Sequence, residues 1–534
     1  MSIIISDLSY HYPNQKNIFE HLSLSINNNS KCGLVGNNGR GKSTLLKLIA
    51  GYLKPVSGDI YLGSKPVYIP QLIKSNFSNV ANMLGVDKKI EALNAIVNGS
   101  ILQTDFDILE DDWDIETKCE IALSYWGLSY LNLNTNIRQL SGGERMKVYL
   151  SKLNIFNPKI ILFDEPTNHL DLSSRELLYK YIEEKKATML IVSHDITLLN
   201  KLEAMYEISL NGIKLYGGNY SFYENQKEIE DNAIINEINH EKKKVNEAQK
   251  KAREIIERQD KRQSQGSRKN IEVRILKKTI VNRGEKTQAK LKEKHDKIIS
   301  DNIYKLKEVQ KQREILNKLK FKFEHSNLHK GKLLISAKGI NKSFEDNKYL
   351  WSSPLDFELY SGERINIIGN NASGKTTLIK LITKQILPTC GTIENAKFNY
   401  WYLDQDYSIL NDESTVLKMA QKHNQNNLKD NEVKHQLTTS LFMSDQWDKK
   451  CKELSGGEKM RLCMCCMIIS NKFSDLIILD EPTNNIDISS FKILLDSIKN
   501  YKGNLIIISH DKYFIKEVGI TKEYYMPTNN TQKN

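Results

Sequence analysis

Two glycine-rich loops hold the residues with the most specific chemistry in this sequence. One reads GNNGRGKST at residues 36–44, and the other reads GNNASGKTT at 369–377. Both fit Gly-x-x-x-x-Gly-Lys-Ser/Thr, a loop whose backbone N–H groups surround a triphosphate while its lysine reaches the β and γ phosphates. We therefore expect Lys42 and Lys375 to bind the phosphates of a nucleotide, with Mg²⁺ beside them.

Acidic pairs follow two short apolar runs, IILFDE and LIILDE, which are typical of buried strands. The first acid of each pair is expected to face the metal, and the second, Glu165 or Glu481, to polarise an attacking water. Gln71 and Gln405 follow the loop lysines at nearly the same interval in the two halves, a spacing that suits a contact with Mg²⁺ or water. The predicted metal ligands are Ser43, Gln71, Asp164, Thr376, Gln405 and Asp480.

The whole series of motifs occurs twice. LSGGE, DEPTN and SHD follow the first glycine-rich loop, and the same three follow the second loop in the same order. The histidines of SHD, His194 and His510, follow the glutamate of DEP at the same interval in both series. We expect both histidines to contact the γ phosphate. Such self-similarity indicates two copies of one domain and therefore two nucleotide sites.

Regular structure must hold these residues in place. CGLVG before the first loop predicts a short buried strand, and STLLKLIAGYL after it predicts a helix that ends ahead of Pro55 and Gly58. Strand, loop and helix in this order, followed by further apolar strands, predict an α/β fold. Tyr12 and Phe344, upstream of the two loops, are candidates to stack on adenine.

Composition and charge limit the classes of function. A chain of 534 residues, 40% hydrophobic and 27% charged, predicts a globular protein of at least two domains. No apolar run is long enough to cross a bilayer, so we expect a cytoplasmic protein. The formal charge is +12, yet residues 241–320 alone hold 26 Lys and Arg against 12 Asp and Glu, a net charge of +14. This basic central segment favours a polyanionic partner.

With the loops, LSGGE and SHD in place, the chain resembles ATP-binding-cassette ATPases over nearly its whole length. The resemblance implies two P-loop cassettes that hydrolyse ATP with Mg²⁺, with Glu165, Glu481, His194 and His510 as catalytic residues. In that family the Ser-Gly-Gly of one cassette caps the ATP held by the other. The residues predicted to bind ATP are Tyr12, Gly36, Asn37, Asn38, Gly39, Arg40, Gly41, Lys42, Ser43, Thr44, Gln71, Ser141, Gly142, Gly143, Asp164, Phe344, Gly369, Asn370, Asn371, Ala372, Ser373, Gly374, Lys375, Thr376, Thr377, Gln405, Ser455, Gly456, Gly457 and Asp480.

Two fused cassettes with a charged helical segment between them resemble the ABC-F family of ribosome-binding translation factors. The central segment is nearly free of glycine and proline, which predicts two long helices folded back as an antiparallel hairpin. The predicted domains are a first cassette at residues 1–222, a basic hairpin linker at 223–330 and a second cassette at 331–534.

The resemblance implies that the linker enters the ribosomal E site, near 23S rRNA and the P-site tRNA, with its tip towards the peptidyl transferase centre. Residues 261–300 hold 13 Lys and Arg against four Asp and Glu, a pattern that favours a phosphate backbone. A plain tether between the cassettes is the alternative interpretation. The predicted RNA-binding residues are Arg268, Lys269, Arg274, Lys277, Lys278 and Arg283.

The expected partner is the 70S ribosome, bound by a monomer whose cassettes pair within one chain, with no membrane or DNA partner. Housekeeping members of the family often carry a large arm in the first cassette. The interval from Gln71 to Ser141 is only moderately longer than that from Gln405 to Ser455, which favours protection against large-subunit antibiotics. A factor that relieves stalled ribosomes and the ATPase subunit of a separate efflux transporter are the alternatives. Asn485 replaces the histidine usual after DEPTN, which argues against equal hydrolysis at the two sites.

Overall fold

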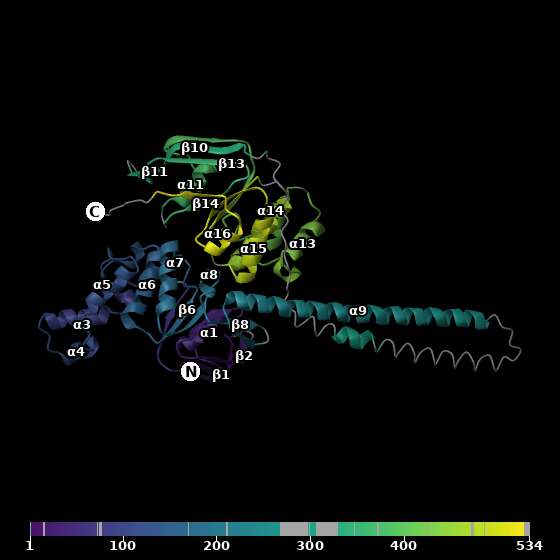
Figure 1. Ribbon diagram of the computed structural model, residues 1–534, viewed down its shortest axis with the longest axis horizontal. Helices are drawn as coiled ribbons and strands as arrows, with labels where there is room; N and C mark the ends of the chain where they lie inside the picture. Colours follow the sequence, from purple (N-terminus) through teal and green to yellow (C-terminus); the bar gives the residue numbers. More distant parts are fainter. Residues whose placement is uncertain are drawn as a thin grey trace. The chain divides into compact units, whose positions relative to one another are not determined.

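The computed structural model in Figure 1 describes most of the chain. By their internal contacts the residues form two units, one of Met1–Tyr220 with Leu319–Asn534 and one of Ser221–Lys318. Within the described residues, no helix is both long and apolar enough to cross a membrane. The described residues are 2–13, 17–71, 73, 77–168, 170–209, 212–267, 297, 299–305, 329, 331–345, 348–370, 373–425, 427–470, 475–484 and 486–527.

A six-stranded sheet forms the centre of the first copy of the repeat. Its order is β5-β6-β7-β3-β8-β9, and the strands are parallel except β9, which pairs antiparallel with β8. β6 and β7 are buried along their whole length, as expected of strands covered on both faces. The strands are β3 (Lys31–Val35), β5 (Pro66–Ile69), β6 (Ile160–Asp164), β7 (Thr188–Val192), β8 (Ala204–Ser209) and β9 (Gly212–Tyr216).

The second copy repeats this arrangement. Its described sheet has the order β16-β17-β18-β14-β19 with every pairing parallel, the same order as β5-β6-β7-β3-β8. The duplication predicted from the motifs is therefore confirmed in the strand order. The strands are β14 (Arg364–Ile368), β16 (Tyr400–Leu403), β17 (Leu476–Asp480), β18 (Asn504–Ile508) and β19 (Lys522–Tyr525).

Each copy also has a three-stranded antiparallel sheet, ordered β2-β1-β4 in the first copy and β13-β10-β15 in the second. Apolar side chains of this sheet, of the parallel sheet and of one helix, α1 or α11, share a single core in each copy. Both helices are thereby fixed between two sheets. The strands are β1 (Ile3–Tyr10), β2 (Phe19–Ile26), β4 (Ser57–Leu62), β10 (Leu333–Asn341), β13 (Leu355–Tyr360) and β15 (Cys390–Asn395), and a short hairpin is formed by β11 (Ser343–Glu345) and β12 (Lys348–Tyr349).

The helix after the first loop is shorter than the sequence predicted. α1 ends at Ile49, because Gly51 adopts a left-handed backbone with φ of 78° and stops the helix before residue 53. The helices of the first copy are α1 (Lys42–Ile49), α2 (Val80–Leu84), α3 (Asp87–Val97), α4 (Gln103–Leu109), α5 (Ile115–Tyr125), α6 (Gly142–Phe156), α7 (Leu172–Glu184) and α8 (Ile196–Leu199).

The helices of the second copy match those of the first except at one place. α3 and α4 have no counterpart between α12 and α13 in the described chain, and they account for most of the extra length of the first copy. They are short, so the described first copy has no long helical arm. The helices of the second copy are α11 (Lys375–Ile382), α12 (Val416–Lys422), α13 (Asp430–Thr439), α14 (Gly456–Ser470), α15 (Ile488–Asn500) and α16 (Lys512–Glu517).

The second unit is dominated by α9 (Tyr220–Ser267), one continuous helix of 48 residues and about 72 Å in length. It begins three residues before the predicted linker and is the long teal helix of Figure 1. Residues 299–305 are also helical. The pKa of Glu241, on α9, is lowered by Lys244, then by His240 and then by Lys305. Lys305 therefore lies near Glu241, which means that the chain returns beside the middle of this helix. The rest of the predicted return helix lies outside the described residues.

Candidate functional site

The two glycine-rich loops have closely similar geometry. Each loop joins a strand, β3 or β14, to the helix that begins at its lysine. Lys42 Nζ donates hydrogen bonds to the carbonyl oxygens of Gly36 (2.6 Å) and Asn37 (3.3 Å). Lys375 Nζ donates to Gly369 (2.6 Å) and Asn370 (3.0 Å) in the same way. The loop therefore curls around the amine and holds the positive charge at the helix N-terminus, where a phosphate binds best.

The last glycine of each loop is required by its backbone. Gly41 and Gly374 have φ of 86° and 89°, a left-handed conformation that favours glycine. A Cβ on Gly41 would also lie 2.7 Å from the Phe19 ring, and one on Gly374 would lie 2.8 Å from Trp351 Nε1. The two loops are therefore built on the same local constraint. Of the predicted loop residues, Asn371 and Ala372 lie outside the described residues.

The hydroxyl after each lysine meets the predicted metal carboxylate. Ser43 Oγ donates to Asp164 Oδ1 at 3.0 Å, and Thr376 Oγ1 donates to Asp480 Oδ2 at 2.7 Å. Hydroxyl and carboxylate oxygens are the hard ligands that Mg²⁺ prefers, so these pairs fit the metal. Burial raises the pKa of both carboxyl groups, although the hydrogen bonds that they accept lower it. Mg²⁺ binding at this place would restore the carboxylate form.

Two tyrosines complete these pairs and were not predicted. Tyr68 Oη donates to Asp164 Oδ2 at 2.9 Å, and Tyr402 Oη donates to Asp480 Oδ2 at 3.3 Å. Both lie on the strand beside the acidic strand, β5 or β16. The sequence held a signal for them, because each tyrosine precedes a predicted glutamine, Gln71 or Gln405, by three residues. Both glutamines follow the carboxyl end of that strand.

Each predicted catalytic glutamate contacts the predicted histidine of its own copy. His194 Nε2 lies 3.0 Å from Glu165 Oε1, and the His194 backbone N–H donates to Glu165 Oε2 at 3.2 Å. His510 Nε2 lies 3.3 Å from Glu481 Oε1. The equal spacing of glutamate and histidine in the two series thus corresponds to one contact made twice.

Burial sets the protonation of these groups. Burial raises the pKa of Glu165 to about 8, although the positive charge of Lys42 lowers it. Burial raises the pKa of Glu481 to about 7, although the charges of Arg175 and Lys375 lower it. It lowers the pKa of His194 and His510 to about 3. At neutral pH the imidazoles are therefore uncharged, and each glutamate is a stronger base than an exposed one.

The LSGGE motifs form helix N-termini. Ser141 Oγ accepts a hydrogen bond from Glu144 N (3.2 Å), and Glu144 Oε2 accepts one from Ser141 N (2.7 Å). Ser455 and Glu458 make the same pair of bonds at 3.3 and 2.8 Å. This capping box fixes the start of α6 and of α14. It leaves the first N–H groups of each helix, which include those of the Gly-Gly pair, at an end that suits an anion.

An aspartate from each copy lies near the loop lysine of the other copy. Asp487 raises the pKa of Lys42, and Asp171 raises that of Lys375, in each case against the lowering that burial causes. Both aspartates cap the following helix, by accepting from Ser490 N (2.6 Å) and from Ser174 N (2.9 Å). The neighbouring position of interest, Asn485, lies outside the described residues.

The two candidate adenine contacts differ. Tyr12 Oη lies 3.2 Å from Thr44 Oγ1 in the first loop, and the Tyr12 ring meets Tyr10 edge to face at 5.2 Å. Phe344, on β11, is 68% exposed, and Lys342 Nζ lies 5.9 Å from its ring centre. The structure therefore brings Tyr12 to its loop, whereas the ring of Phe344 is open to solvent. The six predicted RNA-binding residues, Arg268, Lys269, Arg274, Lys277, Lys278 and Arg283, lie outside the described residues.

Known proteins share the motifs and the fold. A sequence model of the ABC transporter family matches residues 19–168 and 352–484. ABC transporter F family member 5 of Arabidopsis thaliana is 27% identical over 532 residues, covering 94% of this chain and 72% of that protein. Ribosome protection protein VmlR of Bacillus subtilis strain 168 is 26% identical over 522 residues, covering 97% and 86%. The solved structure of archaeal ribosome recycling factor aABCE1, in complex with stalk protein aP1, aligns with a TM-score of 0.58 at 19% identity, over 96% of this chain and 86% of that chain, which shows a shared fold.

Proposed function

Because the chain belongs to the ABC transporter family and is an ABC-F protein, an ATPase that uses ATP with Mg²⁺, we propose that it acts on the 70S ribosome. The observation that carries this proposal is α9, a 48-residue helix between the two ATPase copies, together with the basic excess of residues 241–320, which begin within this helix. The similarity to ribosome protection protein VmlR supports it. In this proposal residues 1–222 and 331–534 are the cassettes and residues 223–330 are the linker.

ATP binding uses the two loops. Lys42 and Lys375 exchange their bonds to loop carbonyls for bonds to the β and γ phosphates. Mg²⁺, when bound, would neutralise phosphate charge. Ser43, Asp164 and Gln71 would hold it in one site, and Thr376, Asp480 and Gln405 in the other. The Ser-Gly-Gly of each copy closes on the ATP of the other, which adds helix N-terminal N–H groups to the phosphate contacts.

Hydrolysis depends on the buried glutamates. Glu165 and Glu481 orient a water towards the γ phosphate and, in the ionised form, accept its proton. Burial raises the pKa of each, which makes the carboxylate a stronger proton acceptor than an exposed one. The uncharged His194 and His510 hold the glutamate on one side and contact the phosphate on the other. Both sites have the contact between glutamate and histidine, whereas Asn485, in place of the histidine usual after DEPTN, argues against equal hydrolysis at the two sites.

The linker makes the contact with RNA. Its positive charge lies in residues 241–320, whereas the rest of the chain carries a small net negative charge. The positive charges of such a segment repel one another in the free protein, and a phosphate backbone would neutralise them. Arg268, Lys269, Arg274, Lys277, Lys278 and Arg283 bind 23S rRNA and the P-site tRNA from the E site. The tip of the linker, pointed at the peptidyl transferase centre, protects the ribosome from large-subunit antibiotics.

Co-sedimentation of the Glu165→Gln, Glu481→Gln variant with purified 70S ribosomes tests the ribosome contact. The amides keep the size of the side chains and remove water activation, so ATP stays bound. We expect the variant to pellet with ribosomes when ATP is present, and to lose at least tenfold of this binding between about 50 and 200 mM salt.

The matched control carries Lys42→Ala and Lys375→Ala in addition, which removes the phosphate contacts and leaves the linker unchanged. This control is expected to stay in the supernatant with or without ATP. If the glutamine variant binds ATP yet does not pellet at any salt concentration, the ribosome is not the partner. Pelleting that is equal with and without ATP would mean that closure of the cassettes does not govern binding.

A further inference from the structure

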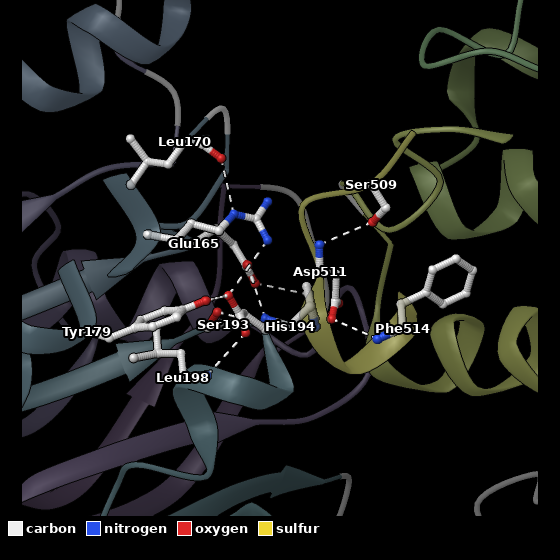
Figure 2. Close-up of polar contacts among 11 residues, drawn as sticks. Glu165, Leu170, Tyr179, Ser193, His194, Leu198, Ser509, Asp511 and Phe514 are labelled. Carbon is white, nitrogen blue, oxygen red and sulfur yellow. Dashed lines mark hydrogen bonds and ion pairs between the residues drawn. The ribbon is translucent and has the colours of Figure 1, made fainter. Parts of the chain in front are cut away.

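Two buried aspartates face each other where the two copies meet. α8 of the first copy contacts α16 of the second. Asp195 caps α8 by accepting from Leu198 N at 3.1 Å, and Asp511 caps α16 by accepting from Phe514 N at 3.0 Å. Each is the last residue of an SHD motif and therefore follows a catalytic histidine. Figure 2 shows the caps and their partners.

One arginine supplies positive charge to this pair. Arg175, on α7, is at most 5% exposed, as are Asp195 and Asp511. Its Nη1 lies 3.7 Å from Asp195 Oδ2, and its Nε donates to the carbonyl oxygen of Leu170 at 3.1 Å. The Tyr179 hydroxyl donates to the same oxygen of Asp195. The guanidinium is thus held in place by its own copy.

The positive charge of Arg175 also affects the pKa of carboxyl groups in the second copy. Burial, followed by the negative charge of Asp195, raises the pKa of Asp511 to about 6, and Arg175 opposes both effects. Arg175 also opposes the raised pKa of Glu481. Two carboxylates brought together in a dry interface cannot both stay ionised without a nearby cation. The positive charge of Arg175 therefore offsets part of the repulsion between the two carboxylates.

The second copy has an apolar residue at the position equivalent to Arg175. Arg175 is the fourth residue of α7, and the fourth residue of α15 is Phe491. Tyr179 of α7 likewise corresponds to Leu495 of α15. Phe491 packs on Phe514, with ring centres 5.9 Å apart. The interface is therefore asymmetric in charge although its two aspartates are equivalent.

From this placement we propose that Arg175 is a positioning residue for ATP-driven closure, the cation that lets the Asp195 and Asp511 carboxylates of the two cassettes come together. This proposal rests on the ATP-binding part of the proposed function and is independent of the ribosome. A single side chain of the first cassette then governs how long both ATP molecules stay enclosed. The exposed ion pair of Lys512 with Glu176, at 2.5 Å, crosses the same interface but is open to solvent and contributes little.

The test measures how long ATP stays enclosed in the Glu165→Gln, Glu481→Gln protein. Labelled ATP is bound with Mg²⁺, free nucleotide is removed by rapid desalting, and the dissociation rate of the bound ATP is followed. Arg175→Met is expected to speed dissociation at least tenfold, and Arg175→Lys to have a smaller effect. Phe491→Met, at the matched position of α15, and Glu176→Gln are expected to change the rate less than twofold.

The decisive variant combines Arg175→Met with Asp511→Asn. Asparagine still caps α16, and removing one of the two carboxylates removes the need for the cation, so dissociation should return to within threefold of the parent. A merely structural role of Arg175 would leave this double variant as fast as Arg175→Met, or unfolded, and either result overturns the proposal. Slow dissociation in Arg175→Met itself would overturn it too. Failure of the parent to retain ATP at all would count instead against the assigned ATP sites.

Discussion

At the scale of single residues, the two glutamates that we propose to activate water share an unusual backbone. Glu165 and Glu481 have φ of 52° and 49°, in the left-handed region that residues with a Cβ avoid. Such a conformation costs roughly 1–3 kcal/mol and persists only where the surrounding structure enforces it. Both copies keep it at the same place, directly after the buried strands β6 and β17. In both copies the carboxylate that follows from this backbone contacts the histidine of the same copy.

Tyr68 and Tyr402 are expected to tune the affinity of the two sites for Mg²⁺, because each donates a hydrogen bond to a predicted metal carboxylate. Tyr68→Phe with Tyr402→Phe removes one hydrogen bond from Asp164 and one from Asp480 and leaves the rings in place. Outer hydrogen bonds of this kind orient a metal ligand and change metal affinity by roughly 10- to 100-fold. We expect the Mg²⁺ concentration that gives half-maximal ATPase rate to rise about tenfold, with the rate at saturating Mg²⁺ changed less than threefold.

Tyr52→Phe is the control for this measurement. The Tyr52 ring packs 5.7 Å from that of Tyr68 but is largely exposed. This substitution leaves the hydrogen bond between Tyr68 and Asp164 in place, so the Mg²⁺ dependence should stay that of the parent. An unchanged Mg²⁺ dependence in the double variant would show that the tyrosines only pack against the acidic strands.

At the scale of elements, the sequence predicted local structure better than it predicted the contacts between elements. The strand, loop and helix around Lys42 follow from apolar runs and glycine spacing, and the structure confirms them. Tyr68 and Arg175 were not predicted as site residues, because their partners, Asp164 and Asp195, lie on other elements and are reached only through sheet order and burial. The early end of α1 was missed because the left-handed turn at Gly51 outweighs the helical pattern that continues beyond it.

α9 gives a prediction at this scale. Most of this helix is polar and exposed, but Ile238 and Val245, seven residues and two turns apart, are buried at 3% and 8% exposure. Ile238→Ala is expected to destabilise the packing of the second unit by roughly 2–5 kcal/mol. Val245→Ala removes fewer atoms and should have a smaller effect, of roughly 0.5–3 kcal/mol. Hydrogen exchange of the α9 amides reports this loss locally, and protection in β6 and β17 should stay unchanged.

Ile229→Ala is the matched change on the same helix, since Ile229 is 62% exposed. It should leave exchange within α9 close to that of the parent. Equal exchange in all three variants would mean that the buried face of α9 does not hold the second unit together, and that helix propensity alone maintains it.

At the scale of the whole molecule, the chain combines two predicted ATP sites with one long helix, so we expect ATP binding at the sites to affect the position of the helix. The cassettes share residues across their interface, with Asp487 near Lys42 and Asp171 near Lys375. We therefore expect closure to respond to both nucleotides together. α9 is about 72 Å long, so we expect a small rotation at its base to move its far end by several ångströms.

Drug-dependent growth distinguishes protection from a general role in translation. Cells that make the protein should tolerate a large-subunit antibiotic at higher concentrations than cells that make Lys42→Ala, Lys375→Ala protein, because only the former can close on ATP and place the linker. A second variant, with the six basic residues between 268 and 283 changed to Gln, keeps ATP hydrolysis in solution and should lose the tolerance to the same extent, since RNA contact and not catalysis is removed. Growth without drug should be the same for all three.

A growth defect of both variants that is equally large without drug would instead identify a factor that relieves stalled ribosomes. Full drug tolerance in the Gln variant would show that the basic charge of the linker is not what engages the ribosome.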